Sequence, residues 1–193
     1  MNVYIIYMHP VKDSFNGSIL KELITSLTEK KHQVEVNHLY AGPFKSHLTW
    51  EEYRESLNHH YESDCEEEQE MIRWADQIIF IFPVWWGGFP AIGKGYIDRV
   101  LSYGFAYELN GESPIPLMKN KKVSMIFTTG APEEEFIESG MYHHMVDLID
   151  KSIFQFCGFK LDGVIHLGDV IQKSDEQRQD MLKIVKEFCD RKY

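Results

Sequence analysis

The chain lacks the residue patterns that mark several large classes of protein. Its 193 residues include only three cysteines, at Cys65, Cys157 and Cys189, and no CxxC pair. Neither a disulfide framework nor a cysteine-based zinc site is therefore expected. Basic residues are also scarce, with 20 Lys and Arg against 30 Asp and Glu and a formal net charge of −10. Such a chain is repelled by nucleic-acid phosphates and anionic membrane surfaces, so we expect no nucleic-acid partner. The scattered cysteines likewise give no reason to expect a metal site.

Long hydrophobic runs are absent as well. No apolar run approaches the ~18–20 residues that cross a bilayer, and the opening residues 1–10 lack the basic start of a secretion signal. The length and a hydrophobic content of 44% are ordinary for one globular domain. We therefore expect a cytoplasmic protein with a single domain over residues 1–193 and no integral membrane segment.

Segments with β propensity alternate with amphipathic segments along the chain. The five expected strands are Val3–Tyr7, Gln33–Leu39, Ile78–Phe82, Val123–Thr128 and Gly163–Leu167. Two of the expected helices run from about Pro90 to Tyr103 and from about Gly140 to Phe156, and a closing helix begins at the capping pair Ser174 and Gln177. A loop with Pro114 and Pro116 is expected before the fourth strand. This alternation predicts an α/β fold with a doubly wound, five-stranded parallel sheet in the flavodoxin-like order 2-1-3-4-5 and helices on both faces. In that order the loops after the first and third strands form the ligand crevice.

The loop after the first strand, residues 9–18, contains hydroxyl and amide side chains but neither GxxxxGK[ST] nor GxGxxG. It leads into a helix, whose free N–H groups and positive dipole end favour an anion, and Ser14, Asn16 and Ser18 add neutral donors. The loop therefore predicts a site for one terminal phosphate. The alternative is that Ser14 or Asn16 only caps the helix.

The loop after the third strand contains two adjacent tryptophans, Trp85 and Trp86, followed by Gly87 and Gly88. Side chains of adjacent residues diverge after a strand, so both rings cannot enter one core. The glycines allow backbone N–H groups to approach a ligand closely, and together these features favour a planar heterocycle. The alternative is a rigid turn with one core Trp and one surface Trp.

The loop after the fourth strand begins with Thr128, Thr129 and Gly130, which offer hydrogen bonds to the rim of a bound ring. Tyr142, His143 and His144 follow near a helix start, where a histidine could relay protons. Neighbouring histidines on a helix point about 100° apart, so they form a poor metal pair.

Taken together, these segments resemble the flavodoxin-like NAD(P)H:quinone oxidoreductase family over nearly the whole chain. The resemblance is carried by His9–Asn16, Pro83–Gly95, Arg99–Tyr107, Thr128–Gly130 and Phe156–Phe159. It implies a homodimer in which NAD(P)H gives a hydride to a flavin and leaves, after which an acceptor takes the hydride. The acceptor would be a quinone or a nitro- or azo-aromatic compound.

The resemblance also implies roles for individual residues. The flavin phosphate would lie among His9, Ser14, Phe15, Asn16 and Ser18. The edge of the flavin ring would lie along Pro83, Val84, Trp85, Trp86 and Gly87. The pyrimidine end of the ring would meet Thr128, Thr129 and Gly130. Trp86 and Tyr107 would contact the substrate, with Tyr107 reaching toward the site of the partner subunit. Relatives carry a Tyr and a His after the Thr-Thr-Gly motif, whereas this chain has Phe136 and Tyr142 there. Tyr142 and His143 are therefore the catalytic candidates, with His144 as a possible substitute.

A single phosphate site and the lack of a long C-terminal extension favour FMN over FAD as the cofactor. Two other functions stay open at this point. One is a flavodoxin-type electron carrier, which needs a protein partner and no NAD(P)H turnover. The other is an ancillary regulatory flavoprotein of a membrane transporter.

Overall fold

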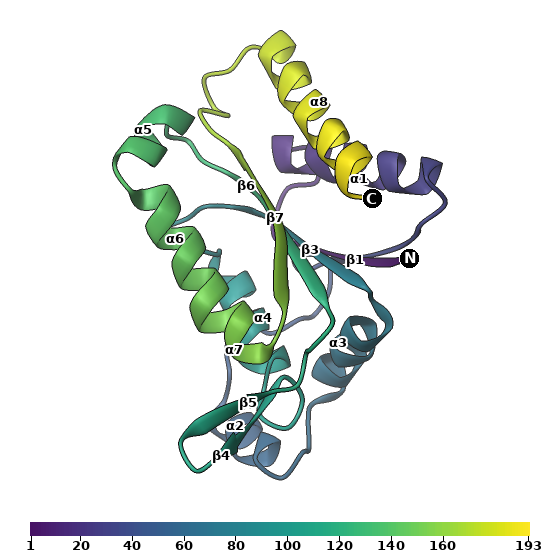
Figure 1. Ribbon diagram of the computed structural model, residues 1–193, viewed down its shortest axis with the longest axis vertical. Coiled ribbons are helices and arrows are strands. Elements are labelled where there is room, and N and C mark those ends of the chain that lie inside the picture. The colour runs from purple at the N-terminus through teal and green to yellow at the C-terminus, as the bar shows by residue number, and fades with distance from the viewer.

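The structure, a computed structural model, describes all of residues 1–193 and is built on a parallel sheet of five strands (Figure 1). The strands are β1 (Asn2–Tyr7), β2 (Gln33–His38), β3 (Gln77–Pro83), β6 (Lys122–Thr128) and β7 (Lys160–Leu167). Their order is β2-β1-β3-β6-β7, and every neighbouring pair runs parallel. The predicted fold class and the predicted order 2-1-3-4-5 are confirmed.

Helices cover both faces of this sheet. On one face lie α1 (Phe15–Glu29) and α8 (Asp175–Lys192), which pack against each other (Figure 1). The other face carries α3 (Ser63–Trp74), α4 (Ala91–Val100) and α6 (Met141–Ile149); the short helices are α2 (Trp50–Ser56), α5 (Glu133–Glu138) and α7 (Gln155–Cys157). Helix α8 begins with the predicted capping box of Ser174 and Gln177. No helix has the length and apolar character that a bilayer crossing requires.

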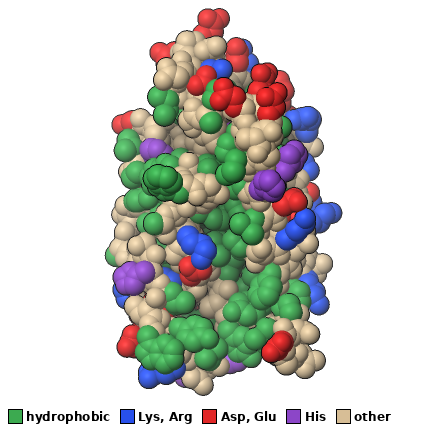
Figure 2. Space-filling model, turned by 90° about the vertical axis from the view of Figure 1, so that its left-hand side faces the viewer, with side chains coloured by type: hydrophobic (Ala, Val, Ile, Leu, Met, Phe, Trp, Pro, Cys, Tyr) green, Lys and Arg blue, Asp and Glu red, His purple; other side chains and the backbone are tan.

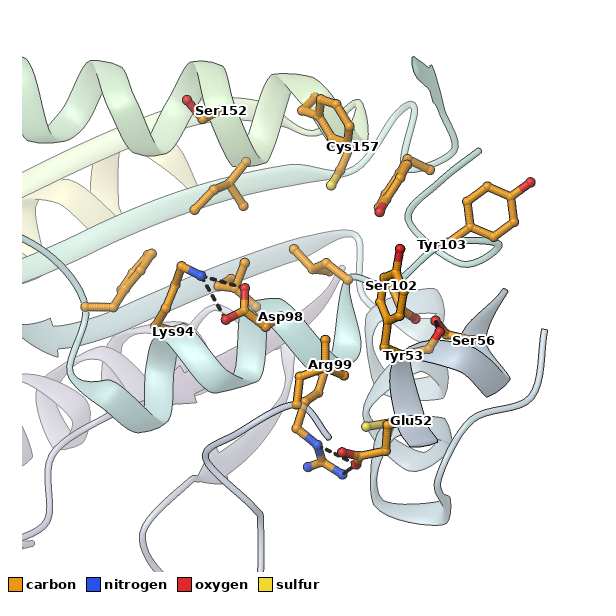
Figure 3. A pocket seen from close by; sticks show the side chains of 18 of the residues that line it. Glu52, Tyr53, Ser56, Lys94, Asp98, Arg99, Ser102, Tyr103, Ser152 and Cys157 are labelled. Atoms are coloured by element: carbon orange, nitrogen blue, oxygen red, sulfur yellow. Dashed lines mark hydrogen bonds and ion pairs between the residues drawn. The ribbon is translucent and has the colours of Figure 1, made fainter. Parts of the chain in front are cut away.

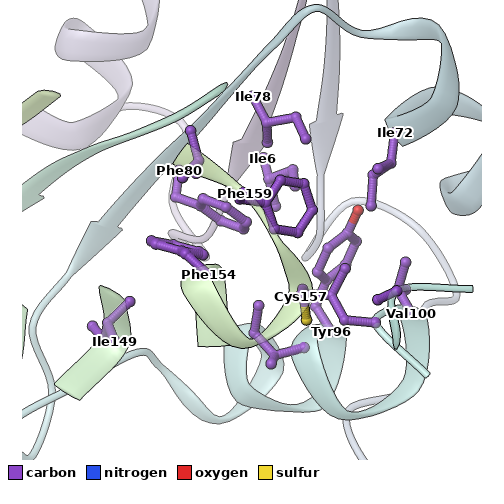
Figure 4. Close-up of a cluster of buried hydrophobic side chains, with 14 of the residues drawn as sticks. Ile6, Ile72, Ile78, Phe80, Tyr96, Val100, Ile149, Phe154, Cys157 and Phe159 are labelled. Atoms are coloured by element: carbon purple, nitrogen blue, oxygen red, sulfur yellow. The ribbon is translucent and has the colours of Figure 1, made fainter. Parts of the chain in front are cut away.

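Two hydrophobic cores lie on opposite faces of the sheet, because successive residues of a strand point to opposite sides. In β1, Ile5 belongs to the core under α1 and α8, whereas its neighbour Ile6 belongs to the core on the α3 and α4 face. Figure 4 shows the latter core, where Phe80 stacks on Phe154 with ring centroids 5.6 Å apart. The continuous apolar runs of β1 and β3 follow from this double coverage.

The segment expected as a loop with Pro114 and Pro116 is instead a two-stranded antiparallel hairpin. Strand β4 (Tyr107–Asn110) pairs with β5 (Ser113–Pro116) through a turn at Gly111, whose φ is +62°. An isolated hairpin has two free edges, and proline at an edge costs no ladder hydrogen bond. The prolines were therefore misleading, and Gly111, the first residue of the two-residue loop Gly111-Glu112, was the informative turn signal.

The single helix expected from about Gly140 to Phe156 is divided into α6, a π-helical segment (η1, Asp150–Phe154) and α7. The backbone N–H of Gln155 donates to the carbonyl of Asp150, five residues back, as a π turn requires. The side chain of Gln155 also donates to the Asp150 carboxylate at 2.7 Å. Other boundaries shift slightly: α4 ends at Val100 rather than near Tyr103, and β7 begins at Lys160 rather than Gly163.

Candidate active site

The loops after β1, β3 and β6 meet at the carboxyl edge of the sheet. The side-chain amide of Asn16, in the first turn of α1, donates to Thr128 Oγ1 at 2.9 Å. The backbone N–H of Val84, just after β3, donates to the carbonyl of Thr128 at 2.8 Å. Thr128 therefore joins all three loops, although Asn16 lies 112 residues from it in sequence.

The loop after β1 exposes a row of backbone donors. Ser14 is the N-cap of α1, and its side chain accepts from the Gly17 N–H at 3.2 Å. The N–H groups of Phe15 and Asn16 have no partner within the chain. Free N–H groups at the positive end of a 15-residue helix form an anion site. Ser14 therefore does cap α1, as the alternative interpretation predicts, but this cap leaves the N–H groups of Phe15 and Asn16 available to a ligand.

Side-chain contacts hold this loop in place. The Tyr7 hydroxyl lies 3.2 Å from both the carbonyl of Val11 and Ser14 Oγ. A Cβ at Gly17 would overlap the backbone carbonyl of Lys12, so glycine is required for this close approach. His9 is half-buried at the start of the loop, with Nδ1 accepting from the Val11 N–H at 3.1 Å.

The other two predicted residues of this loop do not point a polar group into it. Phe15 packs against the core under α1 and α8. Ser18 is exposed on α1, and its hydroxyl lies 3.5 Å from the carbonyl of Ser14. Of the polar side chains predicted here, only Asn16 is buried, and its Oδ1 has no partner.

The loop after β3 forms a tight turn that presents both tryptophans. Pro83 ends β3 in a buried position, and Trp85 and Gly88 exchange backbone hydrogen bonds of 3.1 and 3.2 Å. Between them, Trp86 and Gly87 have φ values of +53° and +78°, a region that a tryptophan rarely occupies. Trp85 is 42% exposed and Trp86 104% exposed. The alternative with one core Trp is therefore wrong, since neither ring is in a core.

The same turn offers backbone donors to a ligand. The N–H groups of Trp86 and Gly87 have no partner in the chain. The start of α6 lies close by, because a Cβ at Gly87 would be 3.6 Å from the end of the Met141 side chain. The turn thus combines an unshielded aromatic ring with two free donors beside the carboxyl edge of the sheet.

The loop after β6 begins with Thr128 and Thr129, both buried, and continues with the exposed Gly130. Thr129 Oγ1 donates to the carbonyl of Ala131 at 2.8 Å and lies 2.8 Å from Nε2 of His166 at the end of β7. The N–H groups of Gly130 and Ala131 have no partner. The three predicted residues of this loop therefore lie at the same edge as the loops after β1 and β3.

The two catalytic candidates at the start of α6 point in different directions. Tyr142 is half-buried, with its ring 6.0 Å from Phe127 and 5.9 Å from His166. Burial raises the pKa of the Tyr142 hydroxyl above its usual value, and the charge of Glu133 adds to the shift. His143 is exposed and meets Tyr142 edge-on at 5.2 Å. Tyr142 therefore faces the sheet end, and His143 lies at the surface.

A cavity of about 1090 Å³ lies next to the turn with the tryptophans. Figure 2 shows this face of the molecule, where hydrophobic side chains line a hollow. Its walls come from the turn, α4, α2 and the α6–η1–α7 segment, and Tyr107 lines it near the hairpin. Within this apolar lining, Lys94 and Asp98 of α4 form an ion pair of 2.6 Å (Figure 3).

The wall formed by α2 is attached to the rest of the molecule by Arg99, whose side chain is 0% exposed. Its guanidinium binds Glu52 of α2, with Nε 2.8 Å away (Figure 3). It also binds both oxygens of Asp64 of α3, each at 2.8 Å. It also donates to the carbonyl of Lys45 at 3.2 Å. The Arg99 hydrogen bonds contribute to holding the pKa values of both carboxyls below their usual values, against the opposing effect of burial.

Comparison with known proteins identifies the family. A family profile described as flavodoxin-like fold matches residues 1–188. A protein of Haemophilus influenzae named as an uncharacterized NAD(P)H oxidoreductase is 36% identical to this chain, over 95% of this chain and 92% of the relative. The chain belongs to the flavodoxin-like NAD(P)H:quinone oxidoreductase family. The family places it among the oxidoreductases.

Two further relatives agree with this membership. A ribosyldihydronicotinamide dehydrogenase [quinone] of Rattus norvegicus is 32% identical, over 93% of this chain and 87% of the relative. The solved structure of an NAD(P)H:quinone oxidoreductase from Methanothermobacter marburgensis superposes with a TM-score of 0.87 at 30% identity, covering 98% of this chain and 95% of that one. These three relatives match most of their own length, so family membership concerns the whole chain.

Sequence reasoning missed two parts of this region. One is His166, which contacts Thr129; the signal was a single polar residue at the end of an apolar strand. The other is the α2 wall, where Tyr53 and Leu57 line the cavity. The signal was the helical spacing of Trp50, Tyr53 and Leu57 in an otherwise polar segment. No group of three or more His, Cys, Asp or Glu side chains is placed to hold a metal ion.

Proposed function

We propose that this member of the family uses FMN to transfer two electrons from NAD(P)H to quinones or related nitro- and azo-aromatic acceptors. The overall reaction balances as NAD(P)H, a proton and a quinone giving NAD(P)⁺ and a hydroquinone. A bound flavin supplies the hydride chemistry, since it accepts a hydride from one substrate and gives it to the next. The two substrates would use one slot in turn, which is a ping-pong scheme.

The observation that carries this proposal is the set of unpaired groups at the carboxyl edge of the sheet. The N–H groups of Phe15 and Asn16 suit one phosphate, and those of Trp86, Gly87 and Gly130 suit the polar rim of a planar ring. A site of this kind for one phosphate favours FMN over FAD. The buried, unpartnered Oδ1 of Asn16 also supports a ligand with donor groups next to this loop.

In this proposal the chain binds and orients, and the cofactor reacts. Ser14 and the first turn of α1 would hold the phosphate, and His9 would flank it. The turn with Trp85 and Trp86 would lie along the ring edge, while the loop from Thr128 to Gly130 would meet its pyrimidine end. Tyr142 and His143 remain the candidates for moving a proton or stabilising charge on the reduced ring.

We also propose that the working unit is a homodimer with the site at the interface. Trp86 is fully exposed, and the 1090 Å³ cavity beside it is open and mostly apolar, as a surface covered by a second copy would be. Tyr107 lines this cavity and would reach toward the partner subunit's site. Each copy would act as one domain over residues 1–193.

The cavity also bears on the alternatives and on location. An apolar hollow of this size next to the ring edge suits a small aromatic acceptor, and a flavodoxin-type electron carrier does not need such a hollow. No feature of the structure favours a role as a subunit of a transporter. The three cysteines are buried and free, which agrees with a reducing compartment, so we place the protein in the cytoplasm.

The test uses purified protein, FMN and the oxidation of NADH by p-benzoquinone. We expect wild-type protein to bind FMN and to turn over. Trp86→Ala removes a ring at the proposed slot, and Trp50→Ala removes an equally large exposed ring of α2 that does not line the cavity. We expect the first variant to lose FMN affinity or acceptor turnover and the second to match the wild type. Wild-type protein that binds no flavin would refute the proposed function, and two variants that behave alike would refute the placement of Trp86.

A further inference from the structure

His166 is a buried polar residue at the carboxyl edge that has no part in the proposed chemistry. It lies near the end of β7, is 7% exposed, and its ring stacks on Phe127 with centroids 4.9 Å apart. Phe136 and Tyr142 complete its surroundings at 5.1 and 5.9 Å. It thus contacts the loop after β6 on one side and the α5–α6 segment on the other.

The hydrogen bonds around Thr129 determine which ring nitrogen of His166 carries the proton. A threonine hydroxyl has one proton, and that of Thr129 is donated to the carbonyl of Ala131. Thr129 Oγ1 must therefore accept in its second contact, so Nε2 of His166 donates across the 2.8 Å distance. The other nitrogen, Nδ1, is buried without any partner. A protonated imidazole would bury a donor and a charge there, so the neutral form is favoured.

The titration behaviour of the ring agrees with this arrangement. Burial lowers the pKa of His166 to about 4, and no neighbouring charge contributes. The side chains that face the ring, from β6, α5, α6 and the loop after β6, are Phe127, Phe136, Tyr142 and Thr129. None of them carries a charge at neutral pH, so a neutral ring meets neutral surroundings.

The chain of hydrogen bonds from His166 to Thr129 to the Ala131 carbonyl closes the turn after β6. This turn leaves the N–H groups of Gly130 and Ala131 free. It also leaves Thr129 Oγ1 with one unused lone pair and no proton to donate. The loop therefore presents the N–H groups of Gly130 and Ala131 as donors and Thr129 Oγ1 as an acceptor. The hydrogen bond from His166 makes Thr129 Oγ1 an acceptor rather than a donor toward a ligand.

We propose that His166 is a positioning residue: as the neutral Nε2–H tautomer it orients Thr129, and through Thr129 it sets the loop that receives the pyrimidine end of the flavin ring. This inference rests on the proposed function. His166 itself touches neither cofactor nor substrate. Its effect should therefore concern the ring end of the cofactor and leave the phosphate end unchanged.

The first experiment tests the tautomer in the cofactor-free protein. Long-range ¹H–¹⁵N correlation spectra distinguish protonated from bare imidazole nitrogens. We expect His166 to show a protonated Nε2 and a bare Nδ1 throughout the range from pH 5.5 to pH 8. A protonated Nδ1, or a ring that becomes charged in this range, would overturn the proposal whether or not a flavin binds.

The second experiment separates the ring from the phosphate by comparing FMN with riboflavin, which has the same ring and no phosphate. His166→Phe keeps an aromatic ring in the cluster but removes the donor. We expect it to weaken both ligands by the same factor, up to about tenfold, as the loss of one neutral hydrogen bond predicts. His166→Gln can still donate to Thr129, and we expect it to restore most of the affinity. Ser14→Ala, in the phosphate loop, should weaken FMN more than riboflavin.

The control is Tyr193→Phe, which removes the 3.1 Å contact between Tyr193 and Ser124 at the other end of β6. We expect it to leave both affinities unchanged. If His166→Phe binds FMN and riboflavin like the wild type, or if Tyr193→Phe weakens them equally, the positioning role is wrong while the proposed function stands. If the wild type binds no flavin, the proposed function fails, and the proposal for the ring end fails with it.

Discussion

The buried imidazole of His166 makes a defined contribution to the pH dependence of stability. Its pKa is about 4 in the folded protein, against an ordinary value of 6.5, and burial is the cause. Between these two values the unfolded chain binds a proton at His166 and the folded chain does not. The unfolded state therefore holds more protons, and the free energy of unfolding falls as the pH falls. This contribution is complete above about pH 6.5 and is lost as the pH falls toward 4.

The size of the effect follows from the shift of the pKa. Each pKa unit corresponds to ~1.36 kcal/mol, so the full shift is equivalent to about 3.4 kcal/mol. Between pH 7 and pH 5 the unfolded state becomes almost fully protonated at His166 while the folded state stays neutral. We therefore expect His166 to lower the free energy of unfolding by about 2 kcal/mol over this interval.

The assay is urea unfolding followed by circular dichroism at several pH values between 5 and 7.5, for wild type and for His166→Phe. All other titrating groups are shared by the two proteins, so they cancel in the difference. The variant loses a hydrogen bond to Thr129 and should be less stable at pH 7, but the gap should narrow by about 2 kcal/mol at pH 5. Two parallel curves would show that His166 is not held neutral by burial.

Two other substitutions test how the cavity wall is held. Arg99→Met leaves the carboxylates of Glu52 and Asp64 without their buried cation, so the free energy of unfolding should fall by about 3–5 kcal/mol in urea titrations. As a control, Arg191→Met at an exposed position should change the free energy of unfolding by less than ~0.5 kcal/mol. Gly95→Ala would drive a Cβ into the backbone of Ser46, and we expect a loss of about 1–3 kcal/mol by the same assay. Gly42→Ala meets nothing within 4 Å and should be close to neutral. Equal stability of the two alanine variants would contradict the close approach of α4 to the segment before α2.

The sheet could be predicted from the sequence because its strands are buried on both faces. Runs such as Val3–Tyr7 and Ile78–Phe82 carry that signal in every residue. The hairpin was missed because Pro114 and Pro116 are typical of loops. A strand tolerates proline only at a sheet edge, and the edge position of β5 is evident only once its pairing with β4 is known. The π turn was missed for a similar reason, since the residues of Asp150–Phe154 are compatible with an ordinary helix.

Residue type indicated which loops to consider together. Adjacent tryptophans with glycines, and a helix start rich in hydroxyl and amide groups, pointed to loops that meet at the carboxyl edge of the sheet. The bridge from Asn16 to Thr128 could not be predicted, because it joins residues far apart in sequence. The exposure of both Trp85 and Trp86 likewise depends on the positive φ of Trp86, which no propensity favours.

The π turn between α6 and α7 has a consequence for how the helix lines the cavity. The residues of this segment that line the cavity recur at intervals of four in two rows, Met145, Ile149, Ile153 and Cys157, and Leu148, Ser152 and Phe156. On a regular α-helix, residues four apart drift by about 40° at each step, so such rows would wind away from the cavity. The wider π turn cancels part of this drift, and both rows stay aligned along the groove. One surplus residue in the winding of the helix thus lengthens a straight contact stripe, and deleting a residue there would restore a regular α-helix in which Phe156 and Cys157 still face the cavity.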